Sequence, residues 1–185
     1  MSSKQDLLMV SLTQFFKIKK NLNKMLNIIN GKSQISLRIL DWYVTNYSKK
    51  NNTSYDIISS DGNLKKFIVF IDYKSQLKAY SKKQFDPFCR RERISFYDHD
   101  NNEIVTTVGQ LNFFRWAIEN NILEYVENNI NVIESDMNNS IKHLYKKNTT
   151  ENNSGKKERR KRQELSISAT KTVNKHDVKI VVTFD

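Results

Sequence analysis

The chain has 185 residues and is poor in cysteine, proline and glycine. Its single cysteine, Cys89, excludes an internal disulfide framework and is typical of a protein in a reducing compartment. There are four glycines, and none of the glycine-dependent motifs G-x-x-x-x-G-K-S/T, G-x-G-x-x-G and G-x-S-x-G occurs. The common signatures of nucleotide-binding proteins and hydrolases are therefore absent.

Long apolar runs are also missing. No run approaches the roughly 20 residues that a membrane-spanning helix needs. The N-terminal segment has only a short apolar patch and no small-residue cleavage site, so we expect no signal peptide. These absences predict an intracellular protein with no membrane partner.

Positive charge is what the chain has in excess, and it is segregated along the sequence. The formal net charge is +11, which favours association with nucleic acid or another anionic surface. Residues 17–50 hold eight basic residues and one acid, whereas residues 103–137 hold six acids and one base. An acidic segment in a basic protein shields part of its own basic surface or contacts a neighbouring subunit, and the sequence leaves both alternatives open.

A second basic block of the expected folded part is residues 73–97, with seven bases and two acids. We expect its cations to contact phosphates and its phenylalanines, Phe85, Phe88 and Phe96, to lie in the core. Three of the lysines are four residues apart and would line one face of a helix. The candidate nucleic-acid-binding residues of this block are Lys74, Lys78, Lys82, Lys83, Arg90, Arg91 and Arg93.

A further basic cluster, KKERRKR, occupies residues 156–162 in a stretch without apolar residues. It matches a nuclear-import signal and equally a flexible arm that contacts phosphates. The sequence does not separate these two interpretations. Its candidate binding residues are Lys156, Lys157, Arg159, Arg160, Lys161 and Arg162.

The candidates for catalysis or metal binding are weak. Cys89 lies beside two arginines, but a nucleophile would need His99 as its base, and a small buried thiol is the preferred interpretation. One cysteine and three histidines offer no zinc-site spacing, and residues 98–109 lack the glycine and glutamate of a calcium loop. We expect no catalytic residue, no metal, no cofactor and no small-molecule substrate.

The apolar pattern predicts an α+β fold: a helical N-terminal part, a small antiparallel sheet, further helices and a C-terminal β-hairpin. One helix is expected over residues 8–29 and a second after Ser33, which would cap it. Residues 66–73 read as a buried strand, and Pro87 ends a short helix over residues 75–83.

Further along the chain, residues 93–97 and 103–108 are expected to form a hairpin. Thr107 and Gln110 then form a capping box that opens the next helix. We expect three parts: a main α+β domain (residues 1–147), a basic flexible linker (148–163) and a C-terminal β-hairpin (164–185). That hairpin would dock on the main domain, extend a sheet or pair with another copy, because an isolated hairpin is marginal in water.

Two strings carry a family resemblance: SQLKAYSKKQFDPFCRRERI at residues 75–94 and TTVGQLNFFRWAIENNILEYV at residues 106–126. With LRILDWYVTNYSKKNN (37–52) and the C-terminal 22 residues, they resemble an uncharacterised protein family of nucleocytoplasmic large DNA viruses, mimivirus-like and iridovirus-like. The resemblance implies a protein made in an infected cell, in a cytoplasmic viral factory or the nucleus, with packaging in the virion left open. It implies no activity.

Charge and resemblance together predict a non-enzymatic, sequence-tolerant nucleic-acid-binding protein, with DNA expected over RNA, in genome packaging or the virion core. The alternative is a structural or scaffolding virion protein that assembles through its C-terminal hairpin as a homo-oligomer. A nuclease with dispersed carboxylates is a third hypothesis that no residue favours.

Overall fold

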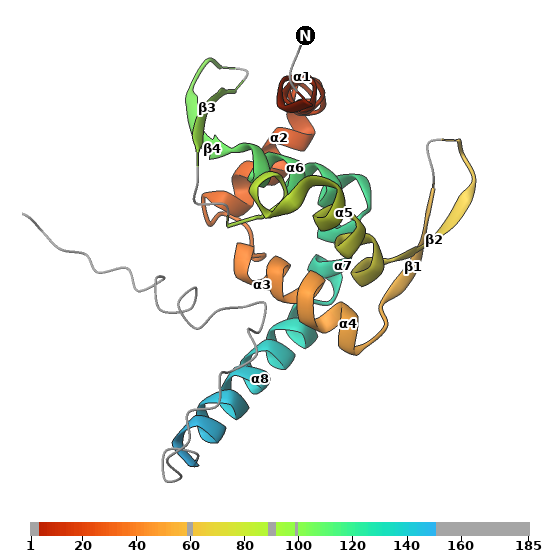
Figure 1. The fold of residues 1–185 in the computed structure, drawn as a ribbon, viewed down its shortest axis with the longest axis vertical. Coiled ribbons are helices and arrows are strands. Elements are labelled where there is room, and N and C mark those ends of the chain that lie inside the picture. The colour runs from red at the N-terminus through yellow and green to blue at the C-terminus, as the bar shows by residue number, and fades with distance from the viewer. Residues whose placement is uncertain (1–3, 59–60, 89–91, 99, 151–185) are drawn as a thin grey trace, which may run out of the picture. The chain divides into compact units, whose positions relative to one another are not determined.

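A computed structural model of the chain describes residues 4–58, 61–88, 92–98 and 100–150. The described residues belong to one compact unit, residues 1–152, built from helices and two small antiparallel sheets (Figure 1). The prediction of an α+β fold is therefore confirmed. The predicted C-terminal hairpin at residues 164–185 lies outside the described residues.

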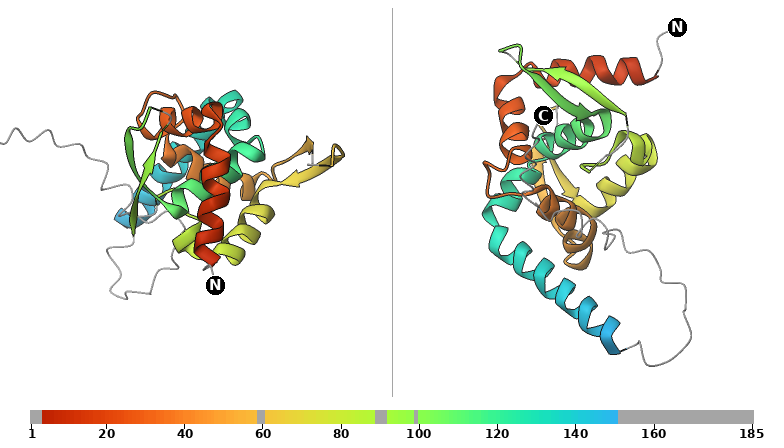
Figure 2. Two further views of the ribbon diagram at one scale, coloured as in Figure 1. Left: turned by 90° about the horizontal axis from the view of Figure 1, so that it is seen from above. Right: turned by 90° about the vertical axis from the view of Figure 1, so that its left-hand side faces the viewer.

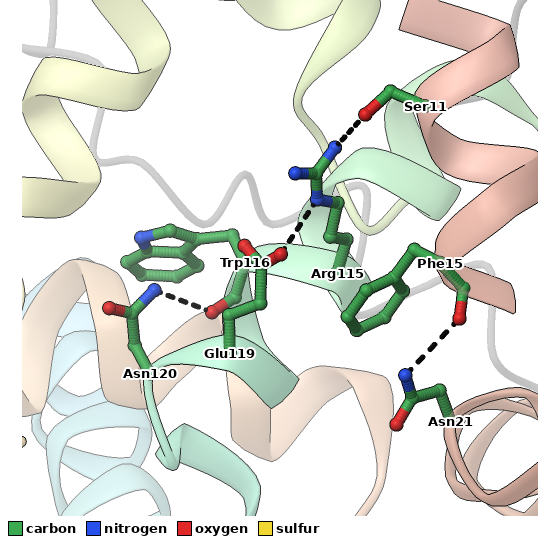
Figure 3. A network of polar contacts seen from close by, with 7 residues as sticks. All are labelled: Ser11, Phe15, Asn21, Arg115, Trp116, Glu119 and Asn120. Atoms are coloured by element: carbon green, nitrogen blue, oxygen red, sulfur yellow. Dashed lines mark hydrogen bonds and ion pairs between the residues drawn. The ribbon is translucent and has the colours of Figure 1, made fainter. Parts of the chain in front are cut away.

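Two helices form at the N-terminus where the apolar spacing predicts one. Helix α1 (Lys4–Phe16) and helix α2 (Lys19–Ile29) are separated at residue 18, whose backbone is extended (φ −77°, ψ 109°). Asn21 Nδ2 donates a hydrogen bond to the Phe15 carbonyl (3.2 Å), which supplies a partner at the interrupted helix end (Figure 3). The buried apolar residues are Leu12 and Phe16 in α1 and Leu22, Met25 and Ile28 in α2.

The next helical stretch consists of α3 (Leu37–Trp42), the π-helical segment η1 (Tyr43–Tyr47) and α4 (Ser48–Lys50). The prediction that Ser33 caps it is wrong. Ser36 is the cap, because its hydroxyl oxygen accepts a hydrogen bond from the Ile39 backbone N–H (3.2 Å). The stretch is central, since Tyr43 and Val44 are completely buried.

Strands β1 (Ser54–Ile58) and β2 (Leu64–Ile68) form an antiparallel hairpin that leads into helix α5 (Val69–Gln84). The prediction of a strand over residues 66–73 is therefore wrong beyond Ile68. That residue pairs with Ser54, so β2 ends where its partner strand begins. Val69 and Tyr73, four residues apart, are the buried residues of the helix that follows. A continuous apolar run does not by itself distinguish a strand from a helix.

Strands β3 (Arg93–Tyr97) and β4 (Glu103–Thr107) form a second hairpin within a residue of the predicted bounds. Helix α6 (Val108–Glu119) follows at once. The Thr107 hydroxyl caps it by accepting from the Gln110 backbone N–H (3.1 Å), as predicted. The Gln110 side chain does not return to the cap; it donates to the Pro87 carbonyl (3.0 Å) and so ties α6 to the segment after α5.

Helix α6 is at the centre of the core. Its aromatic residues meet those of α5 around Phe85, whose ring centroid lies 5.4 Å from that of Trp116 and 5.6 Å from that of Phe113. On the other side, the Arg115 guanidinium donates to the Ser11 hydroxyl (2.6 Å) and pairs with Glu119 (2.9 Å), which fastens α1 to α6 (Figure 3). Arg115, the single base of residues 103–137, thus makes its contacts within the protein.

Helices α7 (Ile122–Asn128) and α8 (Ile130–Thr150) complete the described chain. Helix α8 continues into the first residues of the predicted linker. Figures 1 and 2 show two elements that extend away from the other helices: the β1–β2 hairpin and the C-terminal part of α8. None of the helices in the described ranges is long and apolar enough to cross a membrane.

Candidate nucleic-acid interface

The predicted lysines of α5 are exposed, but they do not share one face. Lys74 and Lys78 are one helical turn apart on a regular part of the helix. Ser81 then adopts non-helical torsions (φ 63°, ψ 165°), so the expected i, i+4 alignment stops before Lys82. Lys82 and Lys83 are exposed on the short turn after this kink.

The predicted arginines fall mostly outside what the structure describes. Arg93 is exposed in β3, opposite Thr107 of β4. Arg90, Arg91 and the cluster at residues 156–162 lie beyond the described ranges, as do Cys89 and His99. Their assigned roles stay predictions.

The structure adds a cation that sequence reasoning left out. Lys49 Nζ lies 5.3 Å from the centroid of the Phe70 ring, and Lys74 Nζ lies 5.4 Å from the same centroid. Both distances are within the range of cation–π attraction. The Phe70 ring is half-buried, whereas both lysines are exposed. We call Lys49, Phe70, Lys74 and Lys78 the α4–α5 basic site.

The β1–β2 hairpin explains why Lys49 reaches this place. The hairpin runs out and back, so its two ends are adjacent, and the Val69 N–H donates to the Thr53 carbonyl across its base (3.2 Å). The last turn of α4 therefore lies beside the first turns of α5. Sequence spacing shows that Phe70 and Lys74 are four apart, but only this return of the chain adds Lys49.

The acidic segment neutralises part of the basic segment. Asp136 Oδ1 pairs with Lys50 Nζ (2.5 Å), and its Oδ2 accepts from Trp42 Nε1 (3.0 Å). Glu124 pairs with Lys24 in the same way. The expectation that the acidic segment shields some of the chain's own basic surface is confirmed at these two points.

A ladder of tyrosine rings supports η1, and through it α4. Tyr43 stacks on Tyr125 (centroids 5.3 Å, 29°), and Tyr125 stacks on Tyr55 of β1 (5.1 Å, 16°). The Tyr55 hydroxyl donates to the Asn120 carbonyl (2.8 Å). Burial raises the pKa of Tyr43 and of Tyr55 well above the ordinary value near 10. The charges of Tyr55 and Tyr125 raise the pKa of Tyr43 further, and the charge of Tyr125 raises that of Tyr55.

The Tyr43 hydroxyl stands out within this ladder. It is fully buried and makes no hydrogen bond of good geometry in the described chain, although the Tyr55 hydroxyl lies close enough to interact with it and to change its pKa. Tyr55 is the neighbour whose charge acts most strongly on the pKa of Tyr43, so the two hydroxyls belong to one electrostatic environment.

Two of the three phenylalanines that the sequence places in the core within residues 73–97 are buried there. Phe85 and Phe96 are buried, with 0% and 8% of their surface exposed, so the prediction that they are core residues is confirmed. Phe88 is only half-buried. Phe70, which the sequence places inside a buried strand, is instead the ring that lies between exposed cations.

Catalytic and metal-binding groups do not assemble in the part of the chain described. No three side chains of histidine, cysteine, aspartate or glutamate are grouped there so as to hold a metal ion. The Asp72 carboxylate, one of the dispersed acids of the nuclease hypothesis, accepts the Trp116 indole N–H (2.6 Å) and so has a structural role. The expectation of a non-enzymatic protein stays untested.

Comparison with known proteins gives a family without an assigned activity. A family of unknown function (DUF7197) matches residues 1–179. "Uncharacterized protein L507" of Acanthamoeba polyphaga mimivirus is 46% identical over 149 residues, which cover 78% of this chain and 54% of that protein. The chain thus spans about half the length of this relative. No solved structure matches it significantly. The predicted resemblance to an uncharacterised viral family is confirmed.

Proposed function

The chain belongs to the DUF7197 family of unknown function, and we propose that it is a non-enzymatic, sequence-tolerant nucleic-acid-binding protein of a large DNA virus. DNA is the preferred ligand under this proposal. The viral context rests on the mimivirus relative, and roles in genome packaging or the virion core follow from it as proposals.

The α4–α5 basic site is the observation that carries the proposal. Lys49, Lys74 and Lys78 are exposed cations from two helices that a third element brings together. Cations spaced along a surface suit the phosphates of a nucleic-acid backbone, which supply affinity without reading sequence. The nearby acid of the acidic segment, Asp136, pairs with Lys50 and with the Trp42 indole, which are not part of this site.

The half-buried Phe70 ring adds an apolar surface between these cations. Under the proposal, the part of the ring that the two ammonium groups leave open contacts a sugar or an unpaired base, in addition to the charge contacts of its neighbours. This combination favours nucleic acid over a purely anionic surface. The predicted clusters at Arg90, Arg91 and Arg93 and at residues 156–162 would add contacts, and two linked basic patches raise effective affinity on a long polyanion.

Fluorescence anisotropy across a salt series tests the proposal, with duplex DNA, single-stranded DNA and RNA as probes. The triple variant Lys49→Ala, Lys74→Ala, Lys78→Ala should lower the slope of log affinity against log salt by about 2 to 3, at roughly 0.9 for each phosphate that is no longer neutralised. Phe70→Leu keeps an apolar side chain, removes the aromatic ring and so tests the contribution of the ring.

The matched control is the triple variant Lys17→Ala, Lys19→Ala, Lys20→Ala. It removes the same charge from exposed lysines around the α1–α2 break. Equal losses from both triple variants would show a diffuse charge effect and would reject the α4–α5 basic site. Absence of salt-dependent binding by the wild-type protein would reject the proposed function.

The structural or scaffolding function is the second candidate. The observation that favours it is the exposed apolar pair Ile58 and Leu64 on the β1–β2 hairpin. This is a different hairpin from the C-terminal one that the sequence predicts.

A further inference from the structure

The β1–β2 hairpin has one face against the protein and one face toward solvent. Tyr55 and Phe67 pair on the inner face, where their ring centroids lie 5.5 Å apart and Phe67 is 4% exposed. Alternation then puts three other cross-strand pairs on the outer face. These outer pairs are Ser54 with Ile68, Asp56 with Lys66, and Ile58 with Leu64.

The outer face is apolar at both ends and charged in the middle. Ile58 and Leu64 are 74% and 75% exposed, more than any other large apolar residue in the described ranges, and Ile68 is 40% exposed. The opposed charges of Asp56 and Lys66 lie between them, and both residues are exposed. Figures 1 and 2 show the hairpin standing clear of the helices, so the protein's own described elements do not cover this face.

Exposing such a face to water is unfavourable for a monomeric protein. A projecting two-stranded ribbon with open edges is marginal in water and is a template for pairing with another chain. Within the described chain, β1 and β2 pair with each other and with no third strand. Exposed opposed aliphatic residues at the far end of such a ribbon indicate a surface that is covered in the functional state.

The charge pattern identifies the occupant as a second copy of the same chain. A two-fold axis that lies in the interface, parallel to the strands and midway between them, sets Asp56 of one copy on Lys66 of the other, twice, and sets Ile58 of each copy on Leu64 of the other. Self-complementarity of this kind is what an isologous interface requires. Nucleic acid fits worse, because residues 54–68 carry two acids and two bases and have no net charge.

We propose that the outer face of the β1–β2 hairpin is a homodimer interface. The proposal is independent of the α4–α5 basic site, whose lysines lie on the helices at the hairpin's base. A face made of three cross-strand pairs is small, so the dimer belongs to the weak class of interfaces that bury less than about 1,200 Å².

Sedimentation equilibrium of the full chain measures this dimer directly. The wild-type protein should show a reversible monomer–dimer equilibrium, and Ile58→Ser with Leu64→Ser should raise the dimer dissociation constant at least about tenfold. Val132→Ser is the control, because it removes an exposed apolar side chain (58% accessible) from helix α8, outside the hairpin. It should leave the equilibrium unchanged.

A charge complementation experiment separates a disrupted interface from a misfolded hairpin. Asp56→Lys alone would bring lysines together across the two-fold axis, and Lys66→Asp alone would bring aspartates together. Each variant should therefore be mostly monomeric. Mixing the two should restore a heterodimer, in which every cross-axis contact pairs opposite charges.

Three results would overturn the proposal. They are a wild-type protein that stays monomeric at every concentration, a Val132→Ser control that weakens the dimer as much as the hairpin variant, and a mixture of charge variants that does not associate. A monomeric wild type whose Ile58→Ser, Leu64→Ser variant loses DNA affinity would assign the hairpin to nucleic acid instead. The proposed nucleic-acid function is tested separately, by the α4–α5 lysines.

Discussion

Tyr43 and Tyr55 make the stability of this protein sensitive to alkaline pH in a way that the fold explains. Both rings belong to the stack that supports η1, and burial raises the pKa of each hydroxyl. A group whose pKa is higher in the folded state than in the unfolded state stabilises the fold fully below its unfolded pKa. That stabilisation is lost as the pH rises above about 10, because the unfolded chain then releases protons that the folded chain keeps.

The size of the loss follows from the linkage relation. For one tyrosine that ionises near 10 when unfolded and stays protonated when folded, the loss at pH 11 is about 1.4 kcal/mol. Tyr43 and Tyr55 together should therefore cost at most about 3 kcal/mol at that pH, because solvent screening reduces the contribution of the half-buried Tyr55. Tyr43→Phe should remove at least about half of this sensitivity, because phenylalanine has no proton to lose in either state.

The two hydroxyls differ at neutral pH. The Tyr43 hydroxyl is buried without a hydrogen bond of good geometry in the described chain, so Tyr43→Phe should be neutral or stabilise the fold by up to about 1 kcal/mol. Tyr55→Phe removes the bond to the Asn120 carbonyl and should destabilise it by about 1 kcal/mol. Tyr97, which is 57% accessible, provides the control. Tyr97→Phe should change neither the stability at neutral pH nor its loss at alkaline pH.

Urea denaturation followed by circular dichroism, repeated from pH 8 to pH 11, measures both effects. The expected pattern is a steep alkaline loss in the wild type and the Tyr97→Phe variant and a shallower one in Tyr43→Phe. A Tyr43→Phe variant that is destabilised at pH 8 by as much as Tyr55→Phe would refute the reasoning, since it would show that the Tyr43 hydroxyl has a bonding partner in solution.

Substitutions at three further positions test the packing around α5 and the contacts of α4. Phe85→Ala empties the centre of the aromatic cluster between α5 and α6 and should cost about 3 to 5 kcal/mol in the free energy of unfolding, whereas Phe85→Leu should cost clearly less. Asp136→Ala leaves the Trp42 indole N–H without its acceptor and should cost about 1 to 3 kcal/mol. Lys50→Ala, at a side chain 66% exposed, should cost under about 1 kcal/mol, and a loss as large as that of Asp136→Ala would show that the ion pair is the main contribution.

The sequence predicts those elements whose signals are local. The β3–β4 hairpin and the Thr107 cap of α6 depend on turn residues and on a capping pattern that neighbours in sequence supply. The break between α1 and α2 escapes prediction because the helical spacing of apolar residues resumes in the same register after it, with Lys19 on the stripe at the break. The prediction of a strand over residues 66–73 is wrong for a related reason. The strand ends at Ile68 because its partner Ser54 is the first residue of β1, which lies across a turn in the sequence.

The same distinction between local and long-range signals applies to the candidate site. That Lys74 and Lys78 would be exposed and one turn apart is readable from their spacing, but the kink at Ser81, which separates Lys82 from them, has no evident local signal. Lys49 joins the site because the β1–β2 hairpin returns the chain to its starting point, with a hydrogen bond across its base. Residues brought together by such a long-range return are beyond pattern reasoning on a single sequence.

The β1–β2 hairpin therefore has two separable consequences for function. Its base sets α4 beside α5 and so assembles the α4–α5 basic site, while its outer face presents Ile58 and Leu64 to a second copy. If both proposals hold, each dimer carries two basic sites on one assembly, and binding at the first raises the effective concentration at the second on a long nucleic acid. Weak dimerisation and sequence-tolerant phosphate contacts then reinforce each other along a polyanion, which is the behaviour expected of a protein that coats or condenses a genome rather than one that recognises a single site.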